Sequence, residues 1–395
     1  MRSVVSHPFA KNANGWGTER LWRVGNARIG VPGKVQRLEQ GKMNRRAVLV
    51  SLRFTPAIVQ HLVAYAKALR ELGFTVEVVL DRAYSEFSEL AEMTCASTEE
   101  QDLERASFSH AIFFNVAFEN AALANRLKRR GARIIYIYHE PWEASFAFLR
   151  TDGFGIRIKA AIAHRVSRPL LKIADLVLVG SKYGLNAYRR ADARYNPRAS
   201  CLPLIYDDEA GRPTREMVQQ KLCFSYLGNI GRVHGFDQFI RTMRESLLRN
   251  SNMRFMIASR FPLPEFVLRD DVIRRNLDKI EVMCGRTLTN EEINGCYRRS
   301  FGVWNVYRRS MQSGVLPKAF MHGTPVVASR VGSFPEYVRD GFNGRFASGD
   351  DPGGVLSVLD EIRERSDEYA DNCRQSFLDI FHYKSKLEEL RQLLA

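Results

Sequence analysis

The strongest constraint on this chain is an alternation of short apolar runs with longer amphipathic stretches, which occurs twice along its 395 residues. A buried-type strand at 47–52, a helix at 57–72 and a strand at 75–80 form one β-α-β unit. The further strands expected in this half lie at 111–115, 133–138 and 176–180. Such an alternation predicts a parallel sheet that is covered by helices on both faces.

A polar stretch at 206–220, which contains Gly and Pro, separates this alternation from a second one. The strands expected after it lie at 223–227, 254–259, 280–284, 302–305 and 325–329. The helices expected there lie at 236–248, 289–299, 314–322 and 352–365. We therefore predict an α/β protein with two Rossmann-like, doubly wound domains, at 43–205 and 221–370, and a cleft between them. The helical tail at 371–395 is expected to return to the first domain. Ligands of such sheets bind beyond the carboxyl ends of the strands.

Residues 1–42 show no sustained period of 2 or 3.6 and are rich in Gly, Asn and Arg. We expect this segment to be disordered or to be a non-native extension. Met43 directly precedes the first strand, so translation from Met43 is a hypothesis that the intact mass of the natural protein would test.

The chain is strongly basic, with 59 Lys and Arg against 44 Asp and Glu and a net charge of +15. This balance favours anionic partners. One basic stretch alternates apolar and basic residues at roughly helical spacing, at 155–166. It is either a helix on an anionic membrane surface or a helix packed on the sheet with a basic outer face. In the first interpretation, the basic residues at the membrane are Arg157, Lys159, Arg165 and Arg168.

Several classes of protein are not indicated. No run approaches the ~18 apolar residues of a membrane-spanning helix, and the start has no signal-peptide pattern. The cysteines are scattered without a C-x-x-C pair, and no P-loop, H-E-x-x-H or D-x-D motif occurs. No RNP-like motif or recognition helix supports nucleic-acid binding. We expect a cytoplasmic protein without a metal site.

The first candidate ligand site is a glycine-rich turn after the strand at 223–227. It contains the candidate ligand-binding residues Gly228, Asn229, Arg232, His234 and Gly235. Glycines let the backbone approach a ligand closely, and the start of a helix favours an anion. The alternative is a purely structural glycine turn.

The second candidate site opens the helix at 314–322. Its residues are Gln312, Ser313, Gly314, Val315 and, further into the helix, Lys318. The free N–H groups of a helix start again favour an anion.

The string H-G-T-P-V-V-A-S-R-V-G-S-F-P-E-Y-V-R-D-G-F-N-G, at 322–344, resembles the donor-binding half of the GT-B nucleotide-sugar glycosyltransferases, above all glycosyltransferase family 4. The turn at 228–235 and the strand at 174–181 are similar to two other motifs of that family. The resemblance covers roughly 45–390. It implies a GT-B fold and transfer of a hexosyl group from a nucleoside-diphosphate sugar, with retention, in cell-surface polysaccharide or glycolipid synthesis. The nucleotide sugar is the donor substrate, and no cofactor is implied.

The chain departs from the family pattern at its charged positions. Ser310 and Lys318 stand where the family has two glutamates, and Asn229 and His234 stand where it has an Arg and a Lys. We expect neighbouring cations to bind the diphosphate instead. These candidates are Arg232, Lys318, and Arg308 or Arg309. The alternative is a catalytically inactive GT-B protein that binds a nucleotide sugar or a glycan.

In the first half, His139, Glu140 and Trp142 follow the strand at 133–138. The resemblance implies a histidine near the transferred sugar, so we expect His139 to orient the sugar or its attacking hydroxyl. Glu140 could bind a sugar hydroxyl, and Trp142 is either a stacking platform for a sugar ring or a buried anchor. The acceptor expected is a glycan or a lipid-linked sugar, at the inner face of the plasma membrane if the protein is peripheral. The alternative for His139 is an ordinary surface residue.

Overall fold

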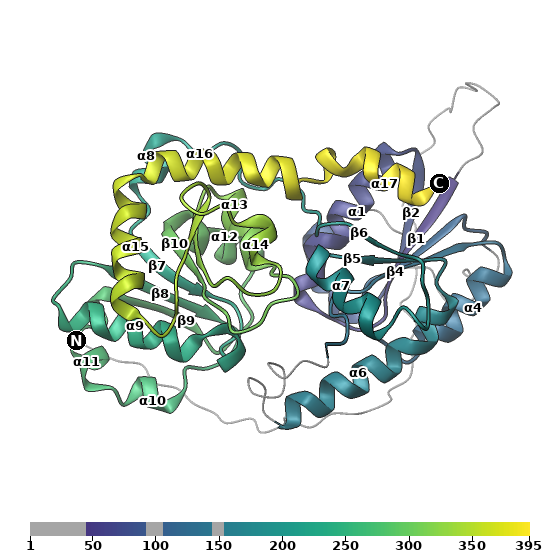
Figure 1. The fold of residues 1–395 in the computed structure, drawn as a ribbon. Coiled ribbons are helices and arrows are strands. Elements are labelled where there is room, and N and C mark those ends of the chain that lie inside the picture. Colours follow the sequence, from purple (N-terminus) through teal and green to yellow (C-terminus); the bar gives the residue numbers. More distant parts are fainter. Residues whose placement is uncertain (1–44, 92–105, 144–153) are drawn as a thin grey trace. The chain divides into compact units, whose positions relative to one another are not determined.

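The computed structural model describes residues 45–91, 106–143 and 154–395, and these form two parallel six-stranded sheets with helices on their faces (Figure 1). The predicted fold class, α/β with two Rossmann-like halves, is confirmed. The expectation for 1–42 lies outside the described residues. A cleft between the halves stays a prediction.

The first sheet has the order β2-β1-β3-β4-β5-β6. Its strands are β1 (Arg45–Ser51), β2 (Phe74–Leu80), β3 (His110–Phe113), β4 (Arg133–Ile137), β5 (Leu176–Val179) and β6 (Ala199–Cys201). The helices of this half are α1 (Val59–Glu71), α2 (Ser88–Ala91), α4 (Asn120–Arg129), α6 (Phe154–Ile173) and α7 (Lys182–Ala191). One core packs α1 against the sheet, and a separate core packs α4, α6 and α7 against it. The strands read as continuous apolar runs because both of their faces are buried.

The second sheet has the order β12-β11-β10-β7-β8-β9. Its strands are β7 (Cys223–Leu227), β8 (Arg254–Ser259), β9 (Ile280–Cys284), β10 (Ser300–Asn305), β11 (Val326–Ala328) and β12 (Gly344–Phe346). The helices of this half are α8 (Arg215–Gln219), α9 (Phe236–Leu248), α10 (Glu265–Leu268), α11 (Asp271–Arg275), α12 (Asn290–Arg299), α13 (Val315–Met321), α14 (Phe334–Tyr337) and α15 (Pro352–Glu364).

Two strands, β6 and β12, were not predicted. Each has three residues and lies at the edge of its sheet. The sequences of these strands, Ala-Ser-Cys and Gly-Arg-Phe, form no apolar run, whereas the equally short β11 reads Val-Val-Ala. Every other strand lies within two residues of its predicted position at each end.

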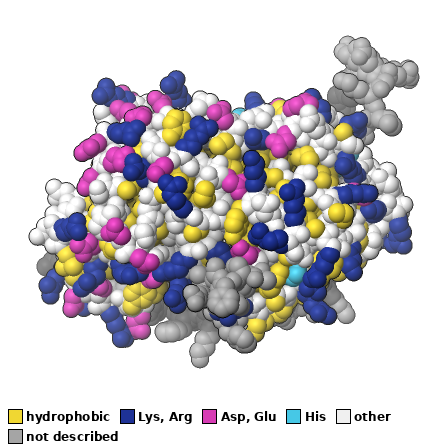
Figure 2. Space-filling model, in the orientation of Figure 1, with side chains coloured by type: hydrophobic (Ala, Val, Ile, Leu, Met, Phe, Trp, Pro, Cys, Tyr) yellow, Lys and Arg dark blue, Asp and Glu magenta, His cyan; other side chains and the backbone are white. Residues whose placement is uncertain are grey.

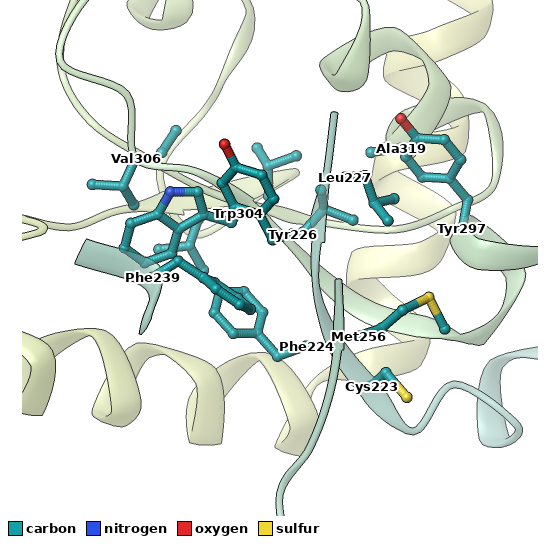
Figure 3. Close-up of a cluster of buried hydrophobic side chains, with 14 of the residues drawn as sticks. Cys223, Phe224, Tyr226, Leu227, Phe239, Met256, Tyr297, Trp304, Val306 and Ala319 are labelled. Carbon is teal, nitrogen blue, oxygen red and sulfur yellow. The ribbon is translucent and has the colours of Figure 1, made fainter. Parts of the chain in front are cut away.

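An aromatic cluster forms the core of the second half (Figure 3). The rings of Phe239, on α9, and Trp304, on β10, are 5.6 Å apart, and that of Phe224, on β7, is 5.7 Å from Phe239. The indole N–H of the fully buried Trp304 donates to the backbone oxygen of His234 at 3.1 Å. The core therefore holds the turn that precedes α9 in one position.

The C-terminal segment runs from the second half to the first (Figure 1). Helix α16 (Ser366–Ser376) packs on the second half, where Tyr369 and Cys373 join the core, and α17 (Leu387–Leu394) packs on the first. Shorter helical turns lie between them. The hydroxyl of Tyr383 donates to Glu71 at 2.7 Å, and Leu390 and Leu394 lie in the core of the first half. Where the chain crosses back, Tyr206 pairs with His382, so the two connections between the halves run side by side.

The stretch at 206–220 is tied down at its start by three consecutive acids. Asp207 pairs with Lys67 of α1, Asp208 with Arg374 of α16, and Glu209 with Lys318 of α13. These residues therefore connect both halves and the C-terminal helices.

We expect Gly332→Ala to destabilise the protein far more than Gly73→Ala. Both glycines have a positive φ, of 56° at Gly332 and 86° at Gly73. A Cβ at Gly332 would lie 1.6 Å from the backbone oxygen of Ser310, whereas a Cβ at Gly73 would have no atom within 4 Å. The backbone penalty of about 1–2 kcal/mol applies to both, and overpacking adds about 1–3 kcal/mol at Gly332 only. Urea unfolding of the two variants measures the difference. Equal losses of stability would show that this loop rearranges freely.

Candidate active site

The two candidate donor loops of the second half lie against each other. Gly228, at the end of β7, has a φ of 123°, and a Cβ there would lie 3.6 Å from the side chain of Val315 at the start of α13. The N–H of Gly228 donates to the backbone oxygen of Ala258 at 3.0 Å. The two turns are thus in contact, although 87 positions separate Gly228 from Val315.

Gly235 has a structural reason to be glycine. Its φ is 65°, and a Cβ there would lie 2.2 Å from the backbone oxygen of Val306. In the same turn, Asn229 and Arg232 are exposed, and the half-buried ring of His234 meets Tyr307 edge to face at 4.8 Å. The turn thus presents one exposed guanidinium, and three of its eight residues, at 228–235, are glycines.

Arg308 is already paired. Its guanidinium binds both carboxylate oxygens of Asp237 at 2.7 Å, and its Nη1 also donates to the backbone oxygen of Arg232 at 2.6 Å. Hydrogen bonding to Asp237 raises the pKa of Arg308. The expectation that Arg308 supplies free charge for a diphosphate is therefore corrected: it neutralises an acid in the first turn of α9.

Lys318 is also corrected. We expected it to reach the diphosphate, but only 6% of it is exposed, and its Nζ donates to Glu209 at 2.5 Å and to Asn294 at 3.1 Å. It lies on the side of α13 that packs toward α12 and the linking segment. Burial lowers the pKa of Lys318, and Glu209 only partly offsets this effect. Its positive charge is used within the fold.

Glu209 is a residue that the sequence analysis missed. One oxygen of its carboxylate accepts hydrogen bonds from Lys318, from Asn294 at 2.8 Å and from Asn290 at 3.1 Å. Lys318 stands where the resembled family has a glutamate, and its charge is paired with Glu209 from the linking segment. The only signal in the sequence was a run of three acids in the linking stretch, and nothing in it pointed to Lys318.

His139, after β4, meets the second candidate loop. The side-chain amide of Gln312 lies 2.9 Å from the Nδ1 atom of His139. The ring of His61 is 5.8 Å from that of His139, and its Nδ1–H donates to the backbone oxygen of Ile205 at 3.0 Å. Burial lowers the pKa of His139 to about 3 and that of His61 to about 4. Both rings are therefore neutral near pH 7, so His139 can offer hydrogen bonds but no positive charge.

Glu140 is exposed, and the half-buried Trp142 stacks on His164 with ring centres 4.9 Å apart. His164 in turn binds the fully buried Asp192 at 2.6 Å. One face of Trp142 is thus covered by protein, as the anchor interpretation expects.

At the start of α13, the remaining candidates have small or polar surroundings. The hydroxyl of Ser313 accepts from Asn305 at 3.4 Å, and a Cβ at Gly314 would lie 3.3 Å from the hydroxyl of Tyr206. Ser310, at the first glutamate position of the resembled family, is buried and donates to the backbone oxygen of Gln312 at 3.2 Å. Position 310 therefore has a hydroxyl group where the resembled family has a carboxylate.

The four candidate membrane residues all lie on α6. Lys159 and Arg165 are exposed, whereas Arg157 and Arg168 are half-buried. The end of α6 packs on the sheet through Leu170 and Leu171, but its first half exposes isoleucines. These are Ile156, Ile158 and Ile162, exposed by 54%, 45% and 42%. The interpretation as a packed helix therefore holds for the end of α6, and a membrane-facing first half stays a prediction.

Within the three described ranges, no group of three or more His, Cys, Asp or Glu could hold a metal ion. Over those same ranges, no helix is long and apolar enough to cross a membrane.

We expect Lys318→Ala to destabilise the fold by about 3 kcal/mol, because removing one partner of a buried ion pair leaves the other charge uncompensated. The double variant Lys318→Met/Glu209→Gln should recover most of that loss, since it removes both charges. Urea unfolding measures the free energies. A Lys318→Ala protein as stable as the wild type would show that the pair contributes nothing, and Lys318 would again be a candidate for ligand binding.

We expect the free energy of unfolding to fall as the pH falls from 7 to 5, and less so in His139→Gln. The unfolded chain protonates this histidine near pH 6.5, whereas the folded protein, with a pKa of about 3, does not. Protons therefore favour the unfolded state over this range, by ~2 kcal/mol at pH 5 for one such group. Urea titrations at the two pH values measure the change. An identical pH dependence in the variant would mean that His139 is protonated in the folded protein.

Known proteins are similar to this chain in two respects: a sequence family matches its second half, and solved structures have the same fold. A family model described as "Glycosyl transferases group 1" matches residues 221–363. No curated protein matches the sequence. Sucrose-phosphate synthase from Thermosynechococcus elongatus has a similar structure, with a TM-score of 0.61, 14% identity, and 89% of this chain and 98% of that chain covered.

HepE from Anabaena, in complex with UDP, is similar with a TM-score of 0.60, 12% identity, and coverage of 89% of this chain and 99% of that chain. A glycosyltransferase from Rickettsia africae has the same TM-score, 11% identity, and coverage of 89% and 98%. These matches confirm the resemblance stated from the sequence: the chain has the GT-B fold of glycosyltransferases, and its second half matches the glycosyl transferases group 1.

Proposed function

We propose that this protein transfers a hexosyl group from a nucleoside-diphosphate sugar to a glycan or lipid-linked acceptor, with retention of configuration. The observation that carries this proposal is the meeting of three loops at the carboxyl ends of strands. Gly228 lies beside Val315, and Gln312 of the same loop binds His139 of the first half. In the resembled family, these are the positions around the donor.

The donor's diphosphate would lie over the two turns of the second half. Arg232 is exposed there, and the glycine backbone around it leaves room for a close approach. The backbone N–H groups of Ser313 and Gly314, at the start of α13, are the further candidates to hydrogen-bond the diphosphate. These groups would stabilise the charge that grows on the leaving diphosphate. With no carboxylate cradle in the sequence, we propose that transfer needs no metal ion.

His139 would act as a neutral hydrogen-bonding group. Because its pKa is about 3, it is no cation for the phosphates. Its contact with Gln312 gives the imidazole a fixed orientation, from which it could position a sugar hydroxyl. Glu140, exposed beside it, would be a partner for the acceptor.

HepE was solved with UDP and with UDP-glucose, which supports a uridine nucleotide as the first donor to test here. The basic, partly apolar start of α6 supports a place for the protein at the inner face of the plasma membrane, in synthesis of a cell-surface polysaccharide or glycolipid.

A catalytically inactive GT-B protein that binds nucleotide sugars is the second candidate. Ser310 and the ion-paired Lys318 favour it, because they replace both family glutamates. Release of free sugar from the donor, or its transfer to any acceptor of a panel, supports the enzyme. Donor binding without either reaction supports the binding module.

We expect UDP or another nucleoside diphosphate to raise the melting temperature of the wild type, with and without EDTA. Arg232→Ala should weaken that binding by about 1.5–3 kcal/mol, the scale of a hydrogen bond to a charged group. Arg249→Ala is the matched control, because Arg249 pairs with Glu245 on the surface of α9 and touches neither candidate loop. Titration calorimetry measures the affinities. Equal weakening in both variants, or binding that EDTA abolishes, would contradict this account of the site.

A further inference from the structure

A second concave region lies apart from the loops described above, between α6, α7 and the residues that follow β4. It is a pocket with a volume of about 950 Å³. Five arginines line it: Arg165 and Arg168 from α6, and Arg189, Arg190 and Arg194 from the end of α7 and the turn after it. The candidate membrane residues Arg157 and Lys159 do not line it.

Among the described residues, the five arginines of this pocket have no carboxylate partner. Arg168 and Arg194 lie over the ring of Tyr195, at 5.3 Å and 4.9 Å. The buried Nε of Arg168 has no hydrogen-bond partner. Glu143 is the acid that lines the pocket, and it accepts a hydrogen bond from the hydroxyl of Tyr183 at 2.5 Å.

Helix geometry explains only part of this clustering. Arg189 and Arg190 lie in the last turn of α7, where basic residues interact favourably with the free carbonyl groups. Arg165 and Arg168 lie well inside α6, where no such compensation exists. Five like charges around one hollow repel one another, and a bound anion would remove that repulsion.

The same pocket has an apolar side. Ile158 and Ile162 line it and are 45% and 42% exposed, and Ile156, one turn away, is 54% exposed. Figure 2 shows hydrophobic side chains next to Lys and Arg side chains over the part of the molecule where Figure 1 draws α6 and α7. A small soluble anion would leave these isoleucines exposed to water, whereas the apolar part of an amphiphile would cover them.

The wall beneath the arginines is rigid. Trp142 stacks on His164 with an interplanar angle of 10°, and His164 is held by the buried Asp192. The N–H of Asp192 donates to the backbone oxygen of Tyr188 at 2.7 Å. These contacts join Trp142, α6 and the end of α7 into one wall of the pocket.

We propose that this pocket binds the phosphate group of a membrane lipid that carries a phosphomonoester or a diphosphate. The arginines would hold the phosphate oxygens through paired N–H groups, and the first part of the acyl chain would cover Ile158 and Ile162. The proposal rests on the membrane association proposed above, to which it adds a lipid class and a specific site. It does not depend on sugar transfer.

The test is flotation of the full chain with phosphatidylcholine vesicles that contain either phosphatidic acid or phosphatidylglycerol, adjusted to equal surface charge. Phosphatidic acid offers a phosphomonoester, whereas phosphatidylglycerol offers only a diester. We expect about fivefold or stronger binding to phosphatidic acid, since additional charge-assisted hydrogen bonds form there. Equal binding to both vesicles would overturn the proposal, because it would show attraction to charge alone. No binding to either would overturn it as well.

The pocket variant is Arg165→Gln/Arg190→Gln, which removes one exposed charge from each wall. Its matched control is Arg157→Gln/Lys159→Gln, which removes two charges from α6 outside the pocket. We expect the pocket variant to lose the preference for phosphatidic acid, and the control to bind both vesicles more weakly but to keep the preference. Loss of the preference in the control, or its survival in the pocket variant, would place the phosphate site elsewhere.

Soluble pyrophosphate separates a lipid site from a site for free phosphate. If pyrophosphate raises the melting temperature of the wild type but not of the pocket variant, while vesicles show no preference, the pocket takes a soluble anion and the lipid proposal fails.

UDP titration of the pocket variant keeps the two proposals apart. Unchanged UDP binding with lost lipid preference supports this site, and a failure of UDP to bind the wild type counts only against the proposed transferase activity.

Discussion

Parallel strand pairing is the constraint on which the rest of this protein depends. Every pairing in both sheets is parallel, so each strand must be followed by a crossover before the next strand begins. All the loops that leave the carboxyl ends of the strands therefore collect at one edge of each sheet. This is why His139, Gly228 and Gln312, which are far apart in the sequence, can belong to one candidate site.

The protein uses its basic residues in two different ways. Some are buried or held in ion pairs, as Lys318 is by Glu209 and Arg308 by Asp237, and these stabilise a loop or a helix start. Others, such as the arginines between α6 and α7, face a hollow and have no acidic partner among the described residues. A net charge of +15 does not distinguish the two groups. Their partners do, and partners are visible only in three dimensions.

The parts of the structure that depend on local patterns were predictable, and those that depend on distant partners were not. Apolar runs and glycine turns located ten of the strands and both loops of the second half. The three-residue strands β6 and β12 carry no such pattern. The role of Lys318 was wrong because its partner Glu209 lies 109 residues earlier, and no spacing rule links the two. The need for glycine at Gly235 likewise comes from a backbone oxygen of Val306, on another loop.

The double connection between the halves has a mechanical consequence. Two bodies joined by a single segment can twist about it, whereas two bodies joined by adjacent, bonded segments resist twisting and bend about the line between them. Here the N–H of Tyr206 donates to Phe381 at 2.8 Å, and the N–H of Tyr383 donates back to Tyr206 at 3.0 Å. The acids at 207, 208 and 209 anchor one of these segments immediately beyond that point. At Tyr206 the two connecting segments are therefore bonded to each other, and the halves are linked by one doubly bonded strip instead of two independent tethers.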